Sequence, residues 1–87
     1  KYNTKRIITV YSEKTEEHIE DLELSSFNLE KFQKIFNVND KTDPMVHCFQ
    51  IEPRHSDFIS KFLSQQISWD FENYSYFLEA FAVDKND

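Results

Sequence analysis

The stretch Tyr74-Ser75-Tyr76-Phe77-Leu78-Glu79-Ala80-Phe81-Ala82-Val83 decides the fold. Apolar residues occupy both sets of alternating positions for most of its length, which is typical of a strand that is covered on two faces. We therefore expect residues 74–83 to form a central strand of a sheet. We expect the rings of Phe71, Phe77 and Phe81 to lie in the core, whereas Tyr74 and Tyr76 are equally compatible with a contact surface, because their hydroxyls need water or a partner.

The start of the chain carries a second strand signal, Arg6-Ile7-Ile8-Thr9-Val10-Tyr11. Almost all of these residues are β-branched or aromatic, which favours a strand over residues 5–11. Residues 12–17 are polar and turn-like, and residues 18–24 alternate in polarity. A second strand that forms a hairpin with the first is therefore expected. A helix is the competing assignment, because residues 16–24 include several good helix formers.

Residues 29–36 carry a helix signal that begins with Asn28, a favoured N-cap residue. Phe27 and Phe32 occupy the two positions of a hydrophobic staple. Asn37 and Asn39 come after the last residue of the helical pattern, and asparagine tolerates the left-handed conformation that ends many helices. The pattern predicts a helix with one apolar face toward the core.

Asp43-Pro44 ends a polar loop, because proline disfavours helical backbone in the residue before it. Alternation over residues 46–51 predicts a third strand, and Pro53 with the apolar spacing that follows predicts a second helix over 53–66. The whole chain, 1–87, therefore reads as one α+β domain of order ββαβαβ. It is expected to be a two-layer sandwich with a mostly antiparallel four-stranded sheet and two helices on one face.

The composition excludes several function classes. The chain contains no glycine, and glycine-rich phosphate loops, the dinucleotide-binding fingerprint and the nucleophile elbow all require it. No cofactor is therefore expected. The single cysteine, Cys48, cannot form an internal disulfide, and no apolar run is long enough for a membrane span. These features predict a cytoplasmic protein without a membrane partner.

Charge points to a protein partner. The formal net charge is −6, which repels nucleic acids and anionic membranes and attracts a basic protein. Solubility alone also accounts for many acidic surfaces. Two stretches are nevertheless concentrated enough to be partner-binding candidates, one acidic and one both acidic and aromatic. Their residues are Glu16, Glu17, Glu20, Asp21 and Glu23 in the first stretch, and Asp70, Glu72, Tyr74 and Tyr76 in the second.

No catalytic or metal-binding residue is predicted. His47 and Cys48 are neighbours on an expected strand, so their side chains point to opposite faces and cannot act as a base and its nucleophile. Cys48 is expected to be a small buried residue. The three histidines lack the spacing of zinc motifs. A small enzyme that uses His55 and Asp57 is a minor rival hypothesis.

The layout resembles that of small bacterial immunity proteins, which are encoded beside contact-dependent growth inhibition toxins or related polymorphic toxins. The resemblance covers nearly the whole chain. It rests on Arg6 to Tyr11, on Leu22 and Leu24, on Leu29, Phe32 and Phe36, on Asp43-Pro44, and on Tyr74 to Glu79.

The resemblance implies a non-enzymatic inhibitor that binds a cognate toxin domain and blocks its active site or its substrate-binding surface. The acidic charge is compatible with a basic, nuclease-type toxin. The alternative is an adaptor or regulatory module that acts through protein contacts, as a homodimer if an exposed strand edge pairs with a second copy.

Overall fold

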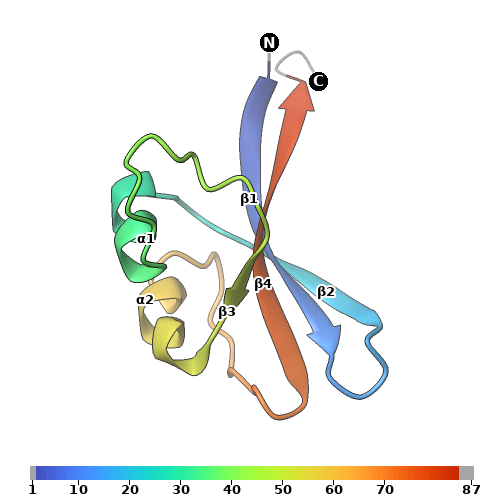
Figure 1. Cartoon of the computed structure of the whole chain (residues 1–87). Coiled ribbons are helices and arrows are strands. Elements are labelled where there is room, and N and C mark those ends of the chain that lie inside the picture. Colours follow the sequence, from blue (N-terminus) through green and yellow to red (C-terminus); the bar gives the residue numbers. More distant parts are fainter. Residues whose placement is uncertain (1, 85–87) are drawn as a thin grey trace.

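The computed structural model describes residues 2–84, which form a four-stranded antiparallel sheet and two short helices (Figure 1). The elements in chain order are β1 (Tyr2–Ser12), β2 (His18–Glu23), α1 (Leu29–Ile35), β3 (Phe49–Ile51), a 3-10 turn (Pro53–His55), α2 (Ser56–Ser60) and β4 (Tyr74–Asp84). The expected ββαβαβ order and α+β class are confirmed.

The strands lie in the order β2-β1-β4-β3, so the first and last strands of the chain occupy the centre of the sheet. β1 and β4 pair over eleven residues, from Tyr2 opposite Asp84 to Ser12 opposite Tyr74. The prediction of a central strand over residues 74–83 is therefore confirmed. The β1–β2 hairpin is also confirmed, with a bulge between Val10 and Tyr11, and the competing helix over residues 16–24 is absent.

Both helices cover one face of the sheet (Figure 1). α1 begins as predicted, because the side chain of Asn28 accepts a hydrogen bond from the backbone N–H of Lys31 at 3.0 Å. The Phe27 and Phe32 rings lie 4.4 Å apart between centroids, so the hydrophobic staple is formed. Asn37 follows the helix with a φ of 59°, in the left-handed region that asparagine tolerates.

The third strand is shorter than predicted, because residues 46–48 do not join it. The loop before residue 46 is bound to β1 instead. The guanidinium of Arg6 donates hydrogen bonds to the backbone carbonyls of Met45 at 2.8 Å and Pro44 at 2.9 Å. Met45 is fully buried at a φ of 53°, which redirects the chain before Phe49 begins β3. The backbone of residues 46–48 therefore runs outside the sheet.

The second helix ends at Ser60 rather than at the predicted Gln66. Residues 62–64 pair instead with the chain that leaves β2: the N–H of Ser25 donates to the carbonyl of Phe62 at 2.7 Å, and the N–H of Ser64 donates to the carbonyl of Glu23 at 3.1 Å. Tertiary pairing thus replaces the helical hydrogen bonds that the apolar spacing had indicated.

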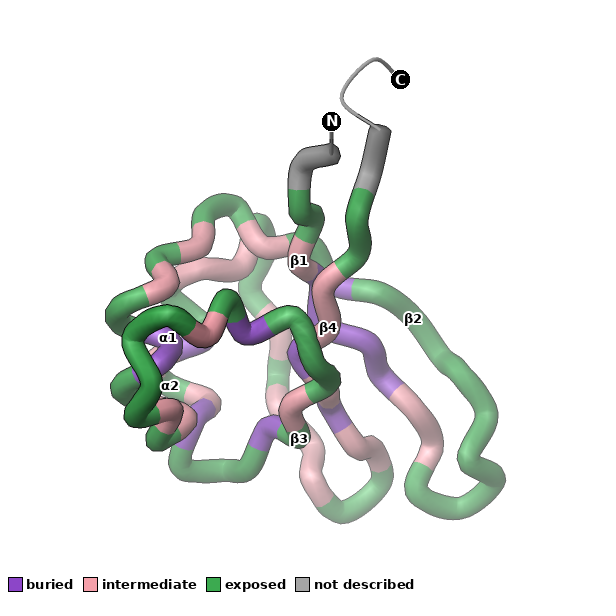
Figure 2. Tube along the Cα trace, turned by 45° about the horizontal axis from the view of Figure 1, so that its top comes forward, coloured by how far each residue is buried: buried purple, intermediate pink, exposed green. Residues whose placement is uncertain are grey.

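The core lies between the sheet and the helices, where the buried positions gather in Figure 2. Phe32 of α1 and Ile59 of α2 are fully buried, and Phe32 packs edge-on against Phe58 and Phe62. The sheet contributes a set of apolar side chains to this core: Ile8, Val10, Leu22, Ile51, Tyr76 and Leu78. Within residues 2–84, no helix has the length and apolarity that a membrane span requires.

Candidate functional site

The face of the sheet that lies opposite the helices carries no covering layer (Figure 1), and we call it the open face. Residues paired across neighbouring antiparallel strands project to the same side, so the register assigns its members. Thr9 lies opposite both Asp21 and Phe77, and Ile7 lies opposite both Glu23 and Glu79. The open face includes Lys5, Ile7, Thr9, Tyr11, His18, Asp21, Glu23, Gln50, Ser75, Phe77, Glu79 and Phe81.

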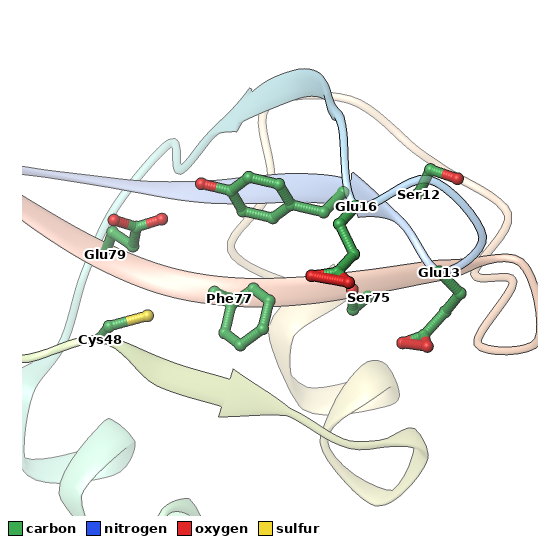
Figure 3. Close-up of a pocket in the computed structure, with 8 residues that line it drawn as sticks. Ser12, Glu13, Glu16, Cys48, Ser75, Phe77 and Glu79 are labelled. Carbon is green, nitrogen blue, oxygen red and sulfur yellow. The ribbon is translucent and has the colours of Figure 1, made fainter.

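A hollow of about 590 Å³ lies on the open face, beside the β1–β2 turn (Figure 3). Its lining combines three carboxylates with two aromatic rings, and it includes no Lys, Arg or His. Figure 3 shows Glu79 on one side of Phe77, and Ser75 with the carboxylate of Glu16 on the other. The lining residues are Tyr11, Ser12, Glu13, Glu16, Cys48, Ser75, Phe77 and Glu79.

Glu79 is a half-buried carboxylate at one end of the hollow. The buried hydroxyl of Thr9 donates a hydrogen bond to one of its oxygens, which fixes the position of the carboxylate on the sheet. Among the described residues, no basic side chain lies within salt-bridge distance of Glu79. Glu79 therefore presents an unpaired negative charge to the hollow.

The turn between β1 and β2 supplies Glu13 and Glu16 and is closed by backbone hydrogen bonds. Ser12 N–H donates to the carbonyl of Glu17 at 2.9 Å, and Glu16 N–H donates to the carbonyl of Ser12 at 2.8 Å. Glu13 N–H donates to the carbonyl of Asn73 at 2.9 Å, which ties the turn to the start of β4. Glu16 adopts a φ of 62°, a left-handed conformation that costs a residue with a Cβ atom about 1–2 kcal/mol.

Aromatic side chains complete the open face. Tyr11 packs edge-on against Phe77, with ring centroids 5.7 Å apart, and against His18 at 5.6 Å. Phe81, farther along β4, is 46% exposed. The prediction that Phe81 belongs to the core is therefore wrong, because its register places it on the open face. Phe77 is half-buried on that same face, outside the core cluster between sheet and helices.

Cys48 is exposed and lines the hollow, which contradicts the predicted burial. The residue precedes β3 and reaches the open face near Glu79 (Figure 3). Partial desolvation of the thiol, and then the negative charge of Glu79, raise the pKa of Cys48. Its neighbour in the rejected catalytic pair, His47, is likewise exposed and outside the strand.

The acidic candidates of the first stretch separate in space. Glu16 lines the hollow, and Asp21 and Glu23 lie on the open face, where each is paired: Asp21 with His18 at 2.7 Å and Glu23 with Lys5 at 3.4 Å. Glu17 lies in the turn and is exposed. Glu20 projects to the helix side of β2, because it pairs with Val10.

The second candidate stretch is divided: its two tyrosines reach the helix side, whereas Glu72 lines a second hollow beside the β1–β2 turn with Glu13 and Lys14. Glu20, Tyr74 and Tyr76 line a separate groove of about 130 Å³ on the helix side. Tyr76 is only 4% exposed and its hydroxyl accepts a hydrogen bond from the N–H of Asp70 at 3.0 Å, so it is a core residue rather than a contact residue. Asp70 is occupied as an acceptor for Asn73, whereas Glu72 is exposed in the loop before β4.

The second candidate stretch, residues 69–79, included Phe77 and Glu79, but Phe77 was expected in the core and neither residue was selected for partner binding, and Tyr11 lay outside both candidate stretches. For Phe77 the available signal was the apolar character of both faces of β4, and this pattern does not reveal which face the helices cover. Glu13 belongs to the same acidic stretch as Glu16, but only the folded turn brings both of them to β4.

No hydrogen bond or ion pair joins His55 and Asp57 in the part of the chain that the structure describes. The ring of His55 is 1% exposed and its Nδ1 accepts a hydrogen bond from the N–H of Glu52 at 2.9 Å, while its Nε2 has no partner. Burial, and then the charge of Arg54, lower the pKa of His55, whereas the charge of Glu52 and the backbone of Ile35 oppose them. Among residues 2–84, no three His, Cys, Asp or Glu side chains lie close enough together to hold a metal ion.

The fold and the open face define a small acidic α+β domain with one uncovered sheet surface. The chain belongs to the family described as a domain of unknown function, DUF7683, whose model matches residues 5–79. No curated protein and no solved structure matched the chain.

Proposed function

We propose that this protein is an immunity protein, which binds a cognate basic bacterial toxin domain and neutralises it by covering its active site or substrate-binding surface. One observation carries the proposal: the hollow on the open face holds carboxylates without a salt-bridge partner around two half-buried aromatic rings, and its lining includes no basic residue. Aromatic side chains are enriched at the centres of protein interfaces and a polar rim surrounds them, while acids at such a rim can pair with Arg and Lys of the partner.

The charge distribution supports a basic partner. The chain has sixteen acidic residues and ten Lys and Arg residues. The described residues form only three salt bridges, Lys5–Glu23, His18–Asp21 and Arg54–Glu52, and all three are exposed. Most carboxylates are therefore free to attract a partner, which accelerates association with a protein of opposite charge.

The same surface argues against nucleic acid as the direct ligand. Aromatic rings stack on unpaired bases in single-strand binders, but those sites also use a positively charged groove for the phosphates. The hollow has carboxylates in the corresponding position. A protein that itself grips phosphate through Arg and Lys is the complementary partner.

A homodimer formed through the edge of the sheet is the rival hypothesis. β2 is an edge strand, and its end is already engaged, because the Leu24–Leu63 bridge and the Ser64 hydrogen bond cover it. The remaining edge carries Glu20 and Asp21, whose charges would repel those of a second copy. The acidic edge of β2 therefore favours a basic partner over self-association through that strand.

Co-expression in bacteria with a candidate basic toxin domain tests the proposal. The wild-type chain is expected to restore growth. The double variant Glu16→Gln/Glu79→Gln is expected to protect less than Glu30→Gln/Asp57→Asn, which removes the same charge from the two helices on the opposite face. Failure of the wild-type chain to protect, together with dimerisation in sedimentation, would favour the rival hypothesis.

A further inference from the structure

The hollow is extended along a strand, and this shape restricts what it can bind. Ser75, Phe77 and Glu79 are alternate residues of β4, so they form a row on the open face. With a rise of about 3.3 Å per residue, positions 75 and 79 are separated by about 13 Å. Glu79 lies at one end of the row, and Glu16 lies beside Ser75 at the other (Figure 3).

The negative charge of the hollow is therefore divided between two ends. Glu13 and Glu16 come from the turn at one end, and Glu79 comes from β4 at the other. This separation agrees with the absence of a metal-holding group of acidic side chains among the described residues. A single compact cation cannot neutralise both ends at once, whereas two cationic groups about 13 Å apart can.

The middle of the hollow suits the alkyl stems of Arg or Lys side chains. The Phe77 ring lies between the two acidic ends, and Tyr11 packs against it at 5.7 Å between centroids. Aromatic surfaces attract both the alkyl stems and the charged heads of Arg and Lys. The chain itself contains such a contact, since the guanidinium of Arg6 lies 3.9 Å from the centroid of the Phe27 ring.

We propose that the hollow binds an extended basic segment of the partner, in which two basic side chains four residues apart reach Glu79 and the Glu13–Glu16 end respectively. In an extended segment, residues i and i+4 project to the same side about 13 Å apart, which matches the backbone spacing of positions 75 and 79, beside which the two acidic ends lie. The inference rests on the proposed function only in assigning this segment to a toxin. The preference for two basic side chains four residues apart, which we call the spacing rule, depends on the hollow alone.

Two peptides of equal composition and charge provide the test. One is acetyl-Thr-Arg-Thr-Ser-Thr-Arg-Thr-amide, with the arginines four residues apart. The other is acetyl-Thr-Thr-Arg-Arg-Ser-Thr-Thr-amide, with adjacent arginines that project to opposite sides when extended. Each is titrated into the ¹⁵N-labelled full chain at constant ionic strength, and the backbone amide shifts give the binding site and the Kd.

The spaced peptide is expected to bind at least threefold more tightly and to shift the amides of residues 75–79 and 13–16 together. Glu16→Gln/Glu79→Gln is expected to abolish this preference, and Glu30→Gln/Asp57→Asn is expected to keep it. Equal binding of the two peptides, or equal effects of the two double variants, would overturn the spacing rule. Growth protection tests the proposed function separately, so a chain that protects without this preference would refute the spacing rule alone.

Discussion

Replacing Glu16 with glycine is expected to stabilise the fold and to weaken partner binding. Glu16 has a φ of 62°, where a side chain with a Cβ atom costs about 1–2 kcal/mol. Glycine removes that cost but loses about 0.5–1 kcal/mol through the greater freedom of the unfolded chain. The free energy of unfolding should therefore rise by about 0.5–1 kcal/mol, or by several °C in Tm for a domain of this size.

Glu17→Gly is the matched control. It removes the same charge from the adjacent position, whose φ is not positive, and it carries the same entropic cost. The backbone hydrogen bond that the Glu17 carbonyl accepts from Ser12 is retained. The difference between the two glycine variants therefore isolates the strain, and we expect Glu16→Gly to be more stable than Glu17→Gly by about 1–2 kcal/mol.

Urea unfolding followed by the fluorescence of Trp69 provides the assay. Trp69 is the single tryptophan, and it stacks on Phe71 while its indole N–H donates to Ser60 at 2.8 Å, so it reports the loss of tertiary structure. The urea concentration at the unfolding midpoint should differ between the two glycine variants, while the m-value stays the same. Equal stability of the two glycine variants would refute the account of Glu16 as a strained residue.

Three further predictions concern the fold. Arg6→Lys loses the pair of hydrogen bonds to the 44–45 loop and should reduce the free energy of unfolding by about 2 kcal/mol in urea, because lysine cannot reproduce the fork. Phe32→Ala removes a fully buried ring and should cost about 3–5 kcal/mol in the same assay. The lowered pKa of His55 means that the unfolded chain binds more protons below pH 6.5, so stability should fall as pH decreases through this range, by at most about 1.4 kcal/mol per pH unit. His55→Gln should flatten that dependence relative to wild type, and parallel pH profiles for the two proteins would contradict it.

Local signals predicted most of the fold. The β-branched run of residues 6–11 and the apolar run of residues 74–83 became the two central strands, and Asn28 with Phe27 set the start of α1. These elements were predictable because their capping and alternation act over a few residues. Sequence reasoning failed where distant groups decide the backbone, as at residues 62–64, which pair with residues 23–25 instead of extending α2.

The contact surface was less predictable than the fold. β4 is apolar on both faces, so its sequence does not show that Tyr76 is buried while Phe81 is exposed. The side that the helices cover depends on packing between distant segments. Acidic residues were recognised by their density, but only the turn brings Glu13 and Glu16 to β4.

The affinity for the cognate toxin domain, measured by calorimetry at low and moderate salt, tests the central claim most directly. We predict that Glu16→Gln/Glu79→Gln raises Kd at least tenfold, or about 1.4 kcal/mol, and that it reduces the dependence of Kd on salt. The control Glu30→Gln/Asp57→Asn, with the same net charge, should change Kd less than threefold. Equal losses of affinity in the two double variants would contradict a binding site on the open face.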